Sequence, residues 1–403
     1  MQRMPLFDTI VCLPITEWAG LPHNSRHLMN EAERRGYRVL WVDPIGLRSA
    51  RLQRKDVAKL TRRLRQFRRP FARVSDRIWR LAPFGIPLQG TRPGAALNRR
   101  MLAFQIRRAL RRLGAERVLL WSYSPHLVKL RHLVNCDLAV YYRTDDYPSA
   151  PGVNVGRLRK LESEAAALAD LCVTVNELSL SDLPNSTRPR LFVPNGVDLT
   201  VFKAASRHDD PVAQVGHPRL LVIGTFDRWV DLDLLRDLML QRPEWSLVLA
   251  GESKVDLEPL TALPNVVFLG QVQLDRLPAL IAGCDVGLAP FFVEPFTVKG
   301  SPGKVYQYLA MGLPVLCTPF IDPLVFAGQI VVAPGDPVDF GEAIEELLDS
   351  NSPELAAARQ AFAAEQSWSV RFDAIEEALA RILAEEPNKD PGSARDDRAQ
   401  ATE

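Results

Sequence analysis

The sequence predicts an α/β protein with two doubly wound, Rossmann-like domains whose parallel sheets face each other across a cleft. Short apolar runs without polar alternation recur along the 403-residue chain, and amphipathic helical patterns separate most of them. Such runs are typical of strands buried on both faces. Thirteen of them are too many for one ordinary sheet, and the repeated strand–helix–strand order indicates parallel sheets with right-handed crossovers.

The predicted strands form two series. The first series covers residues 9–13, 38–42, 78–82, 117–121, 138–142, 171–175 and 190–193. The second covers residues 219–223, 246–250, 266–269, 286–289, 315–317 and 330–332. A polar segment with two prolines, residues 201–218, separates the two series and indicates a domain boundary.

This boundary divides the chain into an N-terminal domain, residues 1–203, and a C-terminal domain, residues 204–368. Residues 369–385 are predicted to form a helix that can cross back to the first domain. Residues 386–403 are polar and rich in charge, and we expect them to be a disordered tail.

The net charge of +2 conceals a strongly basic stretch, residues 48–112, which contains 20 lysines and arginines and only two acids. Bulky apolar residues such as Phe71 and Trp79 lie among the arginines, a mixture that suits an anionic membrane surface or, alternatively, a solvated basic face. No nucleic-acid-binding motif accompanies it, so no nucleic acid partner is expected. The chain shows no apolar run of spanning length and no signal-peptide pattern, so we expect a cytoplasmic protein, peripheral on the inner face of the cell membrane.

Two other chemistries are disfavoured. Asp43 ends the second strand, where a dinucleotide-binding fold places a ribose-binding acid, but the preceding loop has one glycine, Gly20, and no GxGxxG pattern. A dehydrogenase is therefore not expected. The five cysteines form no CxxC pair, so no metal site is expected. Asp231 and Asp233 form a D-x-D at the start of a helix and are interpreted as capping residues.

Candidate residues in the first domain follow strand ends, where open α/β sheets bind ligands. Asp145 and Asp146 follow the strand at 138–142, and either carboxylate can act as a general base or cap the next turn. His126 follows the strand at 117–121 and is either a cleft residue or a polar residue of a helical turn. Asn195, before Gly196, is interpreted as an architectural turn residue.

Candidate residues in the second domain suit a nucleotide diphosphate. Gly224 permits close approach of the backbone to a ligand, Arg228 can reach a phosphate, and Glu294 can accept hydrogen bonds from sugar or ribose hydroxyls.

The segment SPGKVYQYLAMGLPV, residues 301–315, is the most informative of the second domain. Its glycine-rich turn opens a helix whose free N–H groups form an anion site. Lys304 and Gln307 share one face of that helix.

The motifs PNGVD, NVVFLG, DVGLAPF and P-x-K-x-x-x-Y-L-A-x-G-x-P-V follow one another over residues 194–317. Together they resemble bacterial GT-B glycosyltransferases that build surface polysaccharides and glycolipids. The loop with Trp18 and the segments RGYRVLWVDP and YYRTDDY match more loosely. The resemblance implies transfer of a sugar from a nucleotide sugar, UDP-linked above all, to a glycan or lipid-linked acceptor, with Trp18 and His126 at the acceptor cleft and no cofactor.

The family usually carries a glutamate where this chain has Gln307. The lysine–glutamine form of the helix resembles the xanthan glucuronosyltransferase, an inverting enzyme with a UDP-linked uronic acid donor. Its Tyr-Arg-x-x-Asp segment matches residues 142–146. This resemblance makes Asp146 the catalytic base and Lys304 the diphosphate contact, without a metal. A retaining GT-B enzyme, a nucleotide-sugar epimerase and an inactive GT-B scaffold remain as alternatives.

Overall fold

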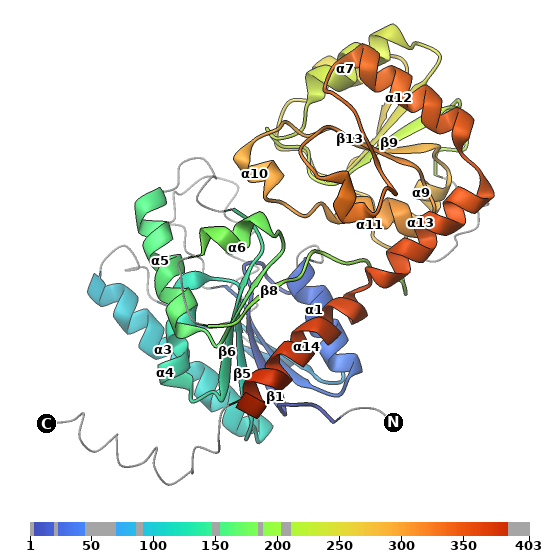
Figure 1. The fold of residues 1–403 in the computed structure, drawn as a ribbon. Coiled ribbons are helices and arrows are strands. Elements are labelled where there is room, and N and C mark those ends of the chain that lie inside the picture. Colours follow the sequence, from blue (N-terminus) through green and yellow to red (C-terminus); the bar gives the residue numbers. More distant parts are fainter. Residues whose placement is uncertain are drawn as a thin grey trace, which may run out of the picture.

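The computed structural model describes residues 4–19, 23–44, 70–85, 92–146, 154–183, 188–202 and 211–385. These residues form two α/β domains, one above the other in Figure 1. The predicted tail, the domain boundary at 203–204 and residues 45–69 of the basic stretch lie outside the described residues.

The N-terminal domain is built on an eight-stranded sheet with the order β3-β4-β2-β1-β5-β6-β7-β8. The strands are β1 (Thr9–Leu13), β2 (Arg38–Val42), β3 (Phe71–Arg73), β4 (Ile78–Leu81), β5 (Val118–Ser122), β6 (Leu138–Arg143), β7 (Leu171–Thr174) and β8 (Arg190–Phe192). All neighbours pair in parallel except β3 and β4, which are antiparallel.

Helices cover both faces of this sheet. They are α1 (Asn24–Arg34), α3 (Arg92–Leu113), η1 (Pro125–Leu130), α4 (Arg131–Val134), α5 (Val155–Leu168) and α6 (Leu178–Asp182). The two-residue period of the strands divides the core accordingly. Ile10 and Cys12 of β1 point into the apolar cluster that includes residues of α1, whereas Val11 and Leu13 point into the cluster below α3.

The C-terminal domain has a six-stranded, fully parallel sheet with the order β11-β10-β9-β12-β13-β14. The strands are β9 (Arg219–Ile223), β10 (Ser246–Ala250), β11 (Val266–Phe268), β12 (Val286–Ala289), β13 (Val315–Cys317) and β14 (Val331–Val332). The helices are α7 (Leu232–Gln241), α8 (Glu258–Thr261), α9 (Leu277–Ala282), α10 (Pro295–Val298), α11 (Gly303–Ala310), η4 (Pro323–Phe326), α12 (Pro337–Ser350), α13 (Pro353–Glu365) and α14 (Trp368–Glu385).

The last helix, α14, runs back across the N-terminal domain and packs beside α1 (Figure 1). Arg35, at the end of α1, pairs with Asp373 at 2.5 Å and with Glu376 at 3.2 Å. Tyr37 also donates its hydroxyl to Glu376. The chain therefore crosses between the domains twice, before β9 and before α14. No helix within the described ranges is long and apolar enough to cross a bilayer.

Strand β3 was not predicted, because three residues are too few for a recognisable pattern. It places part of the basic stretch at the sheet edge. Phe71 and Trp79 are partly buried against the cluster below α3, and Arg80 donates to Asp43 at 2.5 Å. Both aromatic rings also carry an arginine, with the Arg112 guanidinium 5.8 Å from the centre of the Phe71 ring and that of Arg73 5.8 Å from the centre of a Trp79 ring.

Candidate functional site

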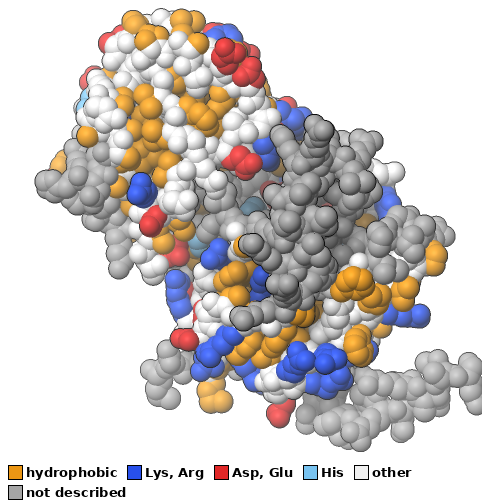
Figure 2. Space-filling model, turned by 180° about the vertical axis from the view of Figure 1, so that it is seen from behind, with side chains coloured by type: hydrophobic (Ala, Val, Ile, Leu, Met, Phe, Trp, Pro, Cys, Tyr) orange, Lys and Arg blue, Asp and Glu red, His pale blue; other side chains and the backbone are white. Residues whose placement is uncertain are grey.

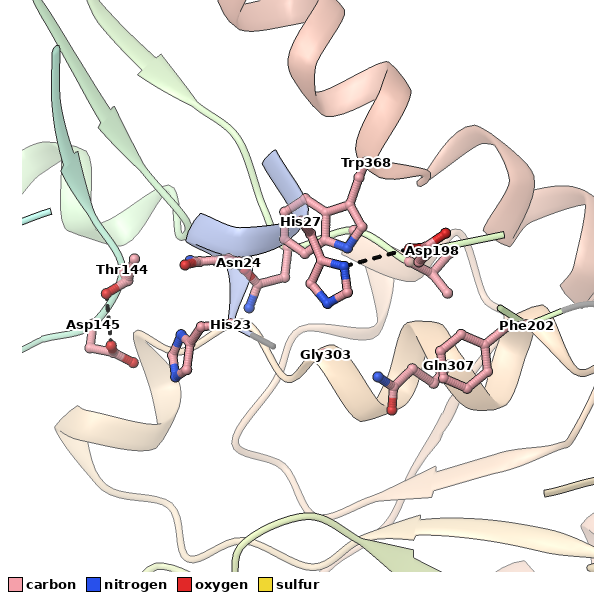
Figure 3. A pocket seen from close by; sticks show the side chains of 13 residues that line it. His23, Asn24, His27, Thr144, Asp145, Asp198, Phe202, Gly303, Gln307 and Trp368 are labelled. Atoms are coloured by element: carbon pink, nitrogen blue, oxygen red, sulfur yellow. Dashed lines mark hydrogen bonds and ion pairs between the residues drawn. The ribbon is translucent and has the colours of Figure 1, made fainter. Parts of the chain in front are cut away.

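A cavity of about 180 Å³ lies between the two domains, at the carboxyl ends of their strands. Both domains line it, and Figure 3 draws the lining residues and labels ten of them. The lining residues are His23, Asn24, His27, Thr144, Asp145, Asn195, Gly196, Val197, Asp198, Phe202, Gly303, Gln307 and Trp368.

The two predicted acids have different surroundings. Asp145 lines the cavity and accepts a hydrogen bond from the Thr144 hydroxyl at 2.9 Å. Asp146 is 3% exposed, and its Oδ1 accepts from Arg143 Nη2 at 2.7 Å. Asp146 is not among the cavity-lining residues. The carboxylate directly at the cavity thus belongs to Asp145, with Asp146 buried beside it.

The start of α11 forms the opposite wall of the cavity. Gly303 and Gln307 line the cavity, and Lys304 lies between them in sequence. Lys304 Nζ stands 4.5 Å from the centre of the Phe291 ring. Burial lowers the pKa of Lys304 to about 7. A cation in such surroundings interacts strongly with an anion that displaces water.

Gly224 lies against Lys304 at the end of β9. A Cβ atom on Gly224 would lie 3.4 Å from Lys304 Nζ, and the residue has φ of +114°, which disfavours other residue types. Gly224 thus brings the end of β9 next to the Lys304 side chain.

Arg228 and Glu294 lie together outside the cavity. Arg228 Nη2 is 3.8 Å from Glu294 Oε2, and both side chains are partly exposed. Glu294 also caps α10 in a capping box with Thr297, whose hydroxyl accepts from Glu294 N at 3.0 Å. Two residues predicted to contact the donor are thus neighbours. Glu294 lies on the segment that leads into α11 and Arg228 follows β9, and neither lines the cavity.

His126 and Trp18 lie apart from this cavity. His126 bonds Ser124 at 2.8 Å and lines a second cavity of about 450 Å³ inside the N-terminal domain. Burial, with a contribution from nearby cations, lowers the pKa of His126 to about 4. Trp18 donates its main-chain N–H to Asp43 at 3.1 Å and lines neither cavity. His126 thus lies at a cavity beyond the carboxyl ends of β1, β2 and β5, separate from the cavity that Asp145 lines, and the placement of Trp18 and His126 at an acceptor cleft stays a prediction.

The second cavity has mostly apolar walls. Its lining comprises Leu13, Pro14, Ile15, Val42, Asp43, Pro44, Ala95, Asn98, Arg99, Leu102, Ser124, His126, Leu127, Arg157 and Leu161. Arg99 and Arg157 lower the pKa of His126, so their charges act at this cavity.

Sequence reasoning missed the histidines of α1. His27 stacks on Trp368 with ring centres 5.3 Å apart, and its Nδ1 lies 3.8 Å from Asp198 Oδ2 (Figure 3). His23 lines the same cavity. The spacing His23-x-x-x-His27 is the available signal: His23 is the N-cap residue of α1 and His27 lies in its first turn, four residues later. Trp368 could not be found in this way, because the crossing of α14 alone brings it there.

Asn195 does more than shape a turn. Its main-chain N–H donates to Ser301 Oγ at 3.0 Å, and its side chain donates to the Ser301 carbonyl at 2.6 Å. Since Ser301 precedes α11, these bonds tie the cavity's two walls together.

The D-x-D pair serves as a helix cap, as predicted. Asp231 accepts from Leu234 N at 2.9 Å at the start of α7, and Asp233 pairs with Arg236 at 2.6 Å. In the part of the chain that the structure describes, no three His, Cys, Asp or Glu side chains lie close enough to hold a metal ion.

Comparison with known proteins agrees with this architecture. Residues 217–350 match the family described as glycosyl transferases group 1. A Bacillus subtilis (strain 168) protein, whose name assigns it to teichuronic acid biosynthesis as glycosyltransferase TuaH, is 25% identical over 284 residues, which are 65% of this chain and 72% of that protein.

Solved GT-B structures share the whole fold. Sucrose-phosphate synthase from Thermosynechococcus elongatus has a TM-score of 0.68 at 16% identity, covering 94% of this chain and 99% of that one. HepE from Anabaena, in complex with UDP-glucose, has a TM-score of 0.64 at 16% identity, covering 93% and 99%. An α,α-trehalose-phosphate synthase (UDP-forming) from Burkholderia vietnamiensis has a TM-score of 0.64 at 14% identity, covering 95% and 100%. The matched domain at residues 217–350 and the Bacillus relative support a glycosyltransferase, and the solved structures show that the chain has the GT-B fold.

Proposed function

We propose that this glycosyltransferase moves a sugar from a UDP-linked donor to a polysaccharide or lipid-linked acceptor. The observation that carries the proposal is the cavity itself, where the start of α11 faces Asp145 across the domain boundary. Binding of UDP-glucose by HepE, which shares the fold, supports the donor class. The name of the Bacillus relative supports an acceptor in cell-envelope polysaccharide.

The donor diphosphate binds at the first turn of α11. The free N–H groups of that turn and the Lys304 ammonium stabilise the negative charge that develops on the departing diphosphate. In this proposal the helix N-terminus and the Lys304 ammonium neutralise the charge that a metal ion neutralises in other transferases. The reaction then needs no metal or other cofactor. Gln307 faces the donor from the next turn of the helix, while Arg228 and Glu294 bind its outer part.

The acidic pair after β6 supplies the general base. We assign this role to Asp146, as the Tyr-Arg-x-x-Asp resemblance implies, and direct displacement at the sugar carbon then inverts its configuration. Asp145 is the alternative base, favoured by its place in the cavity lining. A retaining reaction is the second candidate mechanism, and proton NMR of the fresh product distinguishes it by the configuration of the new bond.

The second cavity of the N-terminal domain suits the lipid-linked acceptor. Apolar walls accept the first part of a lipid chain, and Arg99 and Arg157 attract its phosphate. Neither arginine forms an ion pair with a carboxylate of the described residues, so both charges remain available for an anion. His126 stays uncharged there and serves as a hydrogen-bonding group.

The outer face of the same domain suits an anionic membrane. Phe84, Leu97 and Phe104 are about half exposed, at 51%, 49% and 53%, and α3 carries Arg100 and Arg107 among them. Figure 2 shows lysine and arginine side chains interspersed with hydrophobic ones over this domain. We therefore propose peripheral attachment through the basic stretch 48–112, without nucleic acid as a partner.

Two experiments test the proposed function. The first measures the melting temperature with UDP, GDP and their sugars, and UDP binding raises it because a ligand of the native state stabilises that state. Transfer assays on Asp145→Asn and Asp146→Asn follow. The variant that lacks the general base should show a kcat about 100-fold or more below that of wild type. Full activity in both variants would contradict the base assignment.

The second experiment is flotation with anionic and neutral vesicles. Failure of the protein to float with anionic lipid at low salt would exclude membrane attachment.

A further inference from the structure

A buried cluster of charges surrounds Asp146 and spans both domains. Arg143, only 1% exposed, donates from Nε to Glu162 at 2.8 Å and from Nη2 to Asp146 at 2.7 Å. Its Nη1 lies 3.6 Å from Asp182 Oδ2. Within the described residues, the N-terminal domain thus offers one cation to three carboxylates.

The second cation comes from the C-terminal domain. Lys299 Nζ lies 2.5 Å from Asp182 Oδ2 and 3.9 Å from Asp146 Oδ2. The two carboxylate oxygens of Asp146 therefore face cations of different domains, Arg143 on one side and Lys299 on the other. Only 24% of the Lys299 side chain is exposed, so water screens this charge weakly.

Hydrogen bonds hold the segment that carries Lys299 against the N-terminal domain. Asn176, just after β7, donates its side-chain amide to the carbonyls of Val298 and Gly300 at 3.1 and 3.2 Å. Asn195 bonds Ser301 as described above. The same segment continues into α11 and Lys304, so the position of Lys299 is coupled to the start of the donor helix.

We propose that Lys299 is a positioning residue that links domain closure to the ionisation of the acidic pair. Removal of Lys299 takes a positive charge away from Asp146 and Asp182, and loss of a nearby opposite charge favours the protonated form of a carboxylate. A protonated carboxyl group cannot accept the acceptor's proton. When the domains meet as in this structure, Lys299 compensates the excess negative charge and keeps the base ionised. This inference rests on the proposed role of the acidic pair.

Charged groups from several elements surround Asp146 among the described residues. Arg143 of β6 and Lys299 after α10 pair with Asp146 itself, whereas Glu162 of α5 and Asp182 of α6 pair with Arg143. Burial raises the pKa of Glu162, which marks the cluster as a place where protons are readily taken up.

The test is the pH dependence of kcat/KM for transfer between pH 4 and 8, in Lys299→Met and in wild type. In Lys299→Met, Asp146 loses a cation that lies 3.9 Å away, so the acid limb of the pH profile should move to higher pH by about one unit or more. Lys299→Arg keeps the charge and retains the wild-type limb. Lys254→Met serves as the matched control, because Lys254 pairs with Asp227 at 3.3 Å within the C-terminal domain. Circular dichroism at each assay pH confirms that every variant stays folded, and activity regained at pH 7 excludes irreversible damage.

A double variant makes the test specific for charge. Asp182→Asn together with Lys299→Met removes one negative and one positive charge, so the acid limb returns toward that of wild type. An unchanged acid limb of the pH profile in Lys299→Met overturns the inference. A weaker affinity for UDP as the sole effect of Lys299→Met also overturns it, because Lys299 would then be a donor contact. Inactivity of wild type, or full activity of both aspartate variants, would instead overturn the proposed function.

Discussion

The carbonyl oxygen of Gly224 would lie only 1.7 Å from a Cβ atom placed on Gly251. The two residues end the neighbouring strands β9 and β10, and the Gly224 N–H donates to the Ala250 carbonyl at 2.9 Å. Gly251 also has φ of +152°, a conformation that is nearly restricted to glycine. The backbones at the ends of β9 and β10 are thus in direct contact beside Lys304, with no side chain between them.

We therefore expect Gly251→Ala to destabilise the protein by more than about 3 kcal/mol, because it combines backbone strain with a direct clash. Gly270→Ala is the matched control, since Gly270 has φ of +64° but nothing within 4 Å of its Cβ position. It should cost only about 1–2 kcal/mol. Urea denaturation of both variants gives the comparison, and equal losses would contradict the close approach.

Lys304 should make donor binding dependent on pH. Its pKa of about 7 lies well below the ordinary value, so the charged form predominates only below pH 7. An anion stabilises that charged form, and UDP binding above pH 7 should therefore take up a proton and weaken as the pH rises to 8.5. Calorimetry at pH 8 in two buffers of different ionisation enthalpy measures the uptake.

Replacement of Lys304 removes this effect. Lys304→Met should weaken UDP binding about 10- to 100-fold, as expected for a lost charged contact, and abolish the proton uptake. Lys129→Met is the control, because Lys129 pairs with Glu164 on the N-terminal domain at 2.6 Å. Equal proton uptake in wild type and Lys304→Met would show that another group titrates.

His126 should make the N-terminal domain sensitive to acid. Its folded-state pKa of about 4 is below the ordinary 6.5, so the unfolded chain takes up the proton first. The stability that this histidine contributes is complete above pH 6.5 and falls as the pH drops toward 4. The melting temperature of His126→Phe should therefore fall less than that of wild type between pH 6.5 and pH 4.5. A parallel fall in both proteins would contradict a buried, neutral His126.

Asp231→Ala tests the assignment of the D-x-D pair. Loss of the cap of α7 should cost about 1 kcal/mol of stability. Asp233→Ala, which loses an exposed ion pair, should stay within about 0.5 kcal/mol of wild type. Transfer by both variants should be equally insensitive to EDTA. Inactivation of Asp231→Ala that Mn²⁺ reverses would instead identify a metal ligand.

The sequence alone determined the two-domain α/β fold and the helix that begins at Gly303. Thirteen predicted strands correspond to strands of the two sheets, because burial on both faces leaves continuous apolar runs that are read locally. The glycine-rich turn before Lys304 was found in the same way, since turn chemistry and helix starts depend on neighbouring residues. Strand β3 escaped because pairing with β4, rather than its own three residues, makes it a strand.

Only the tertiary structure decided how the candidate residues combine. Asp145 and Asp146 are adjacent in sequence, yet Asp145 lines the cavity and Asp146 is buried and paired with Arg143. The direction of each side chain follows from packing around β6. His126 belongs to another cavity, and Trp368 reaches His27 only through the return of α14. Lys299 and Asp146 come from different domains. Their approach depends on how two separately folded sheets dock, and local sequence patterns carry no information about that long-range geometry.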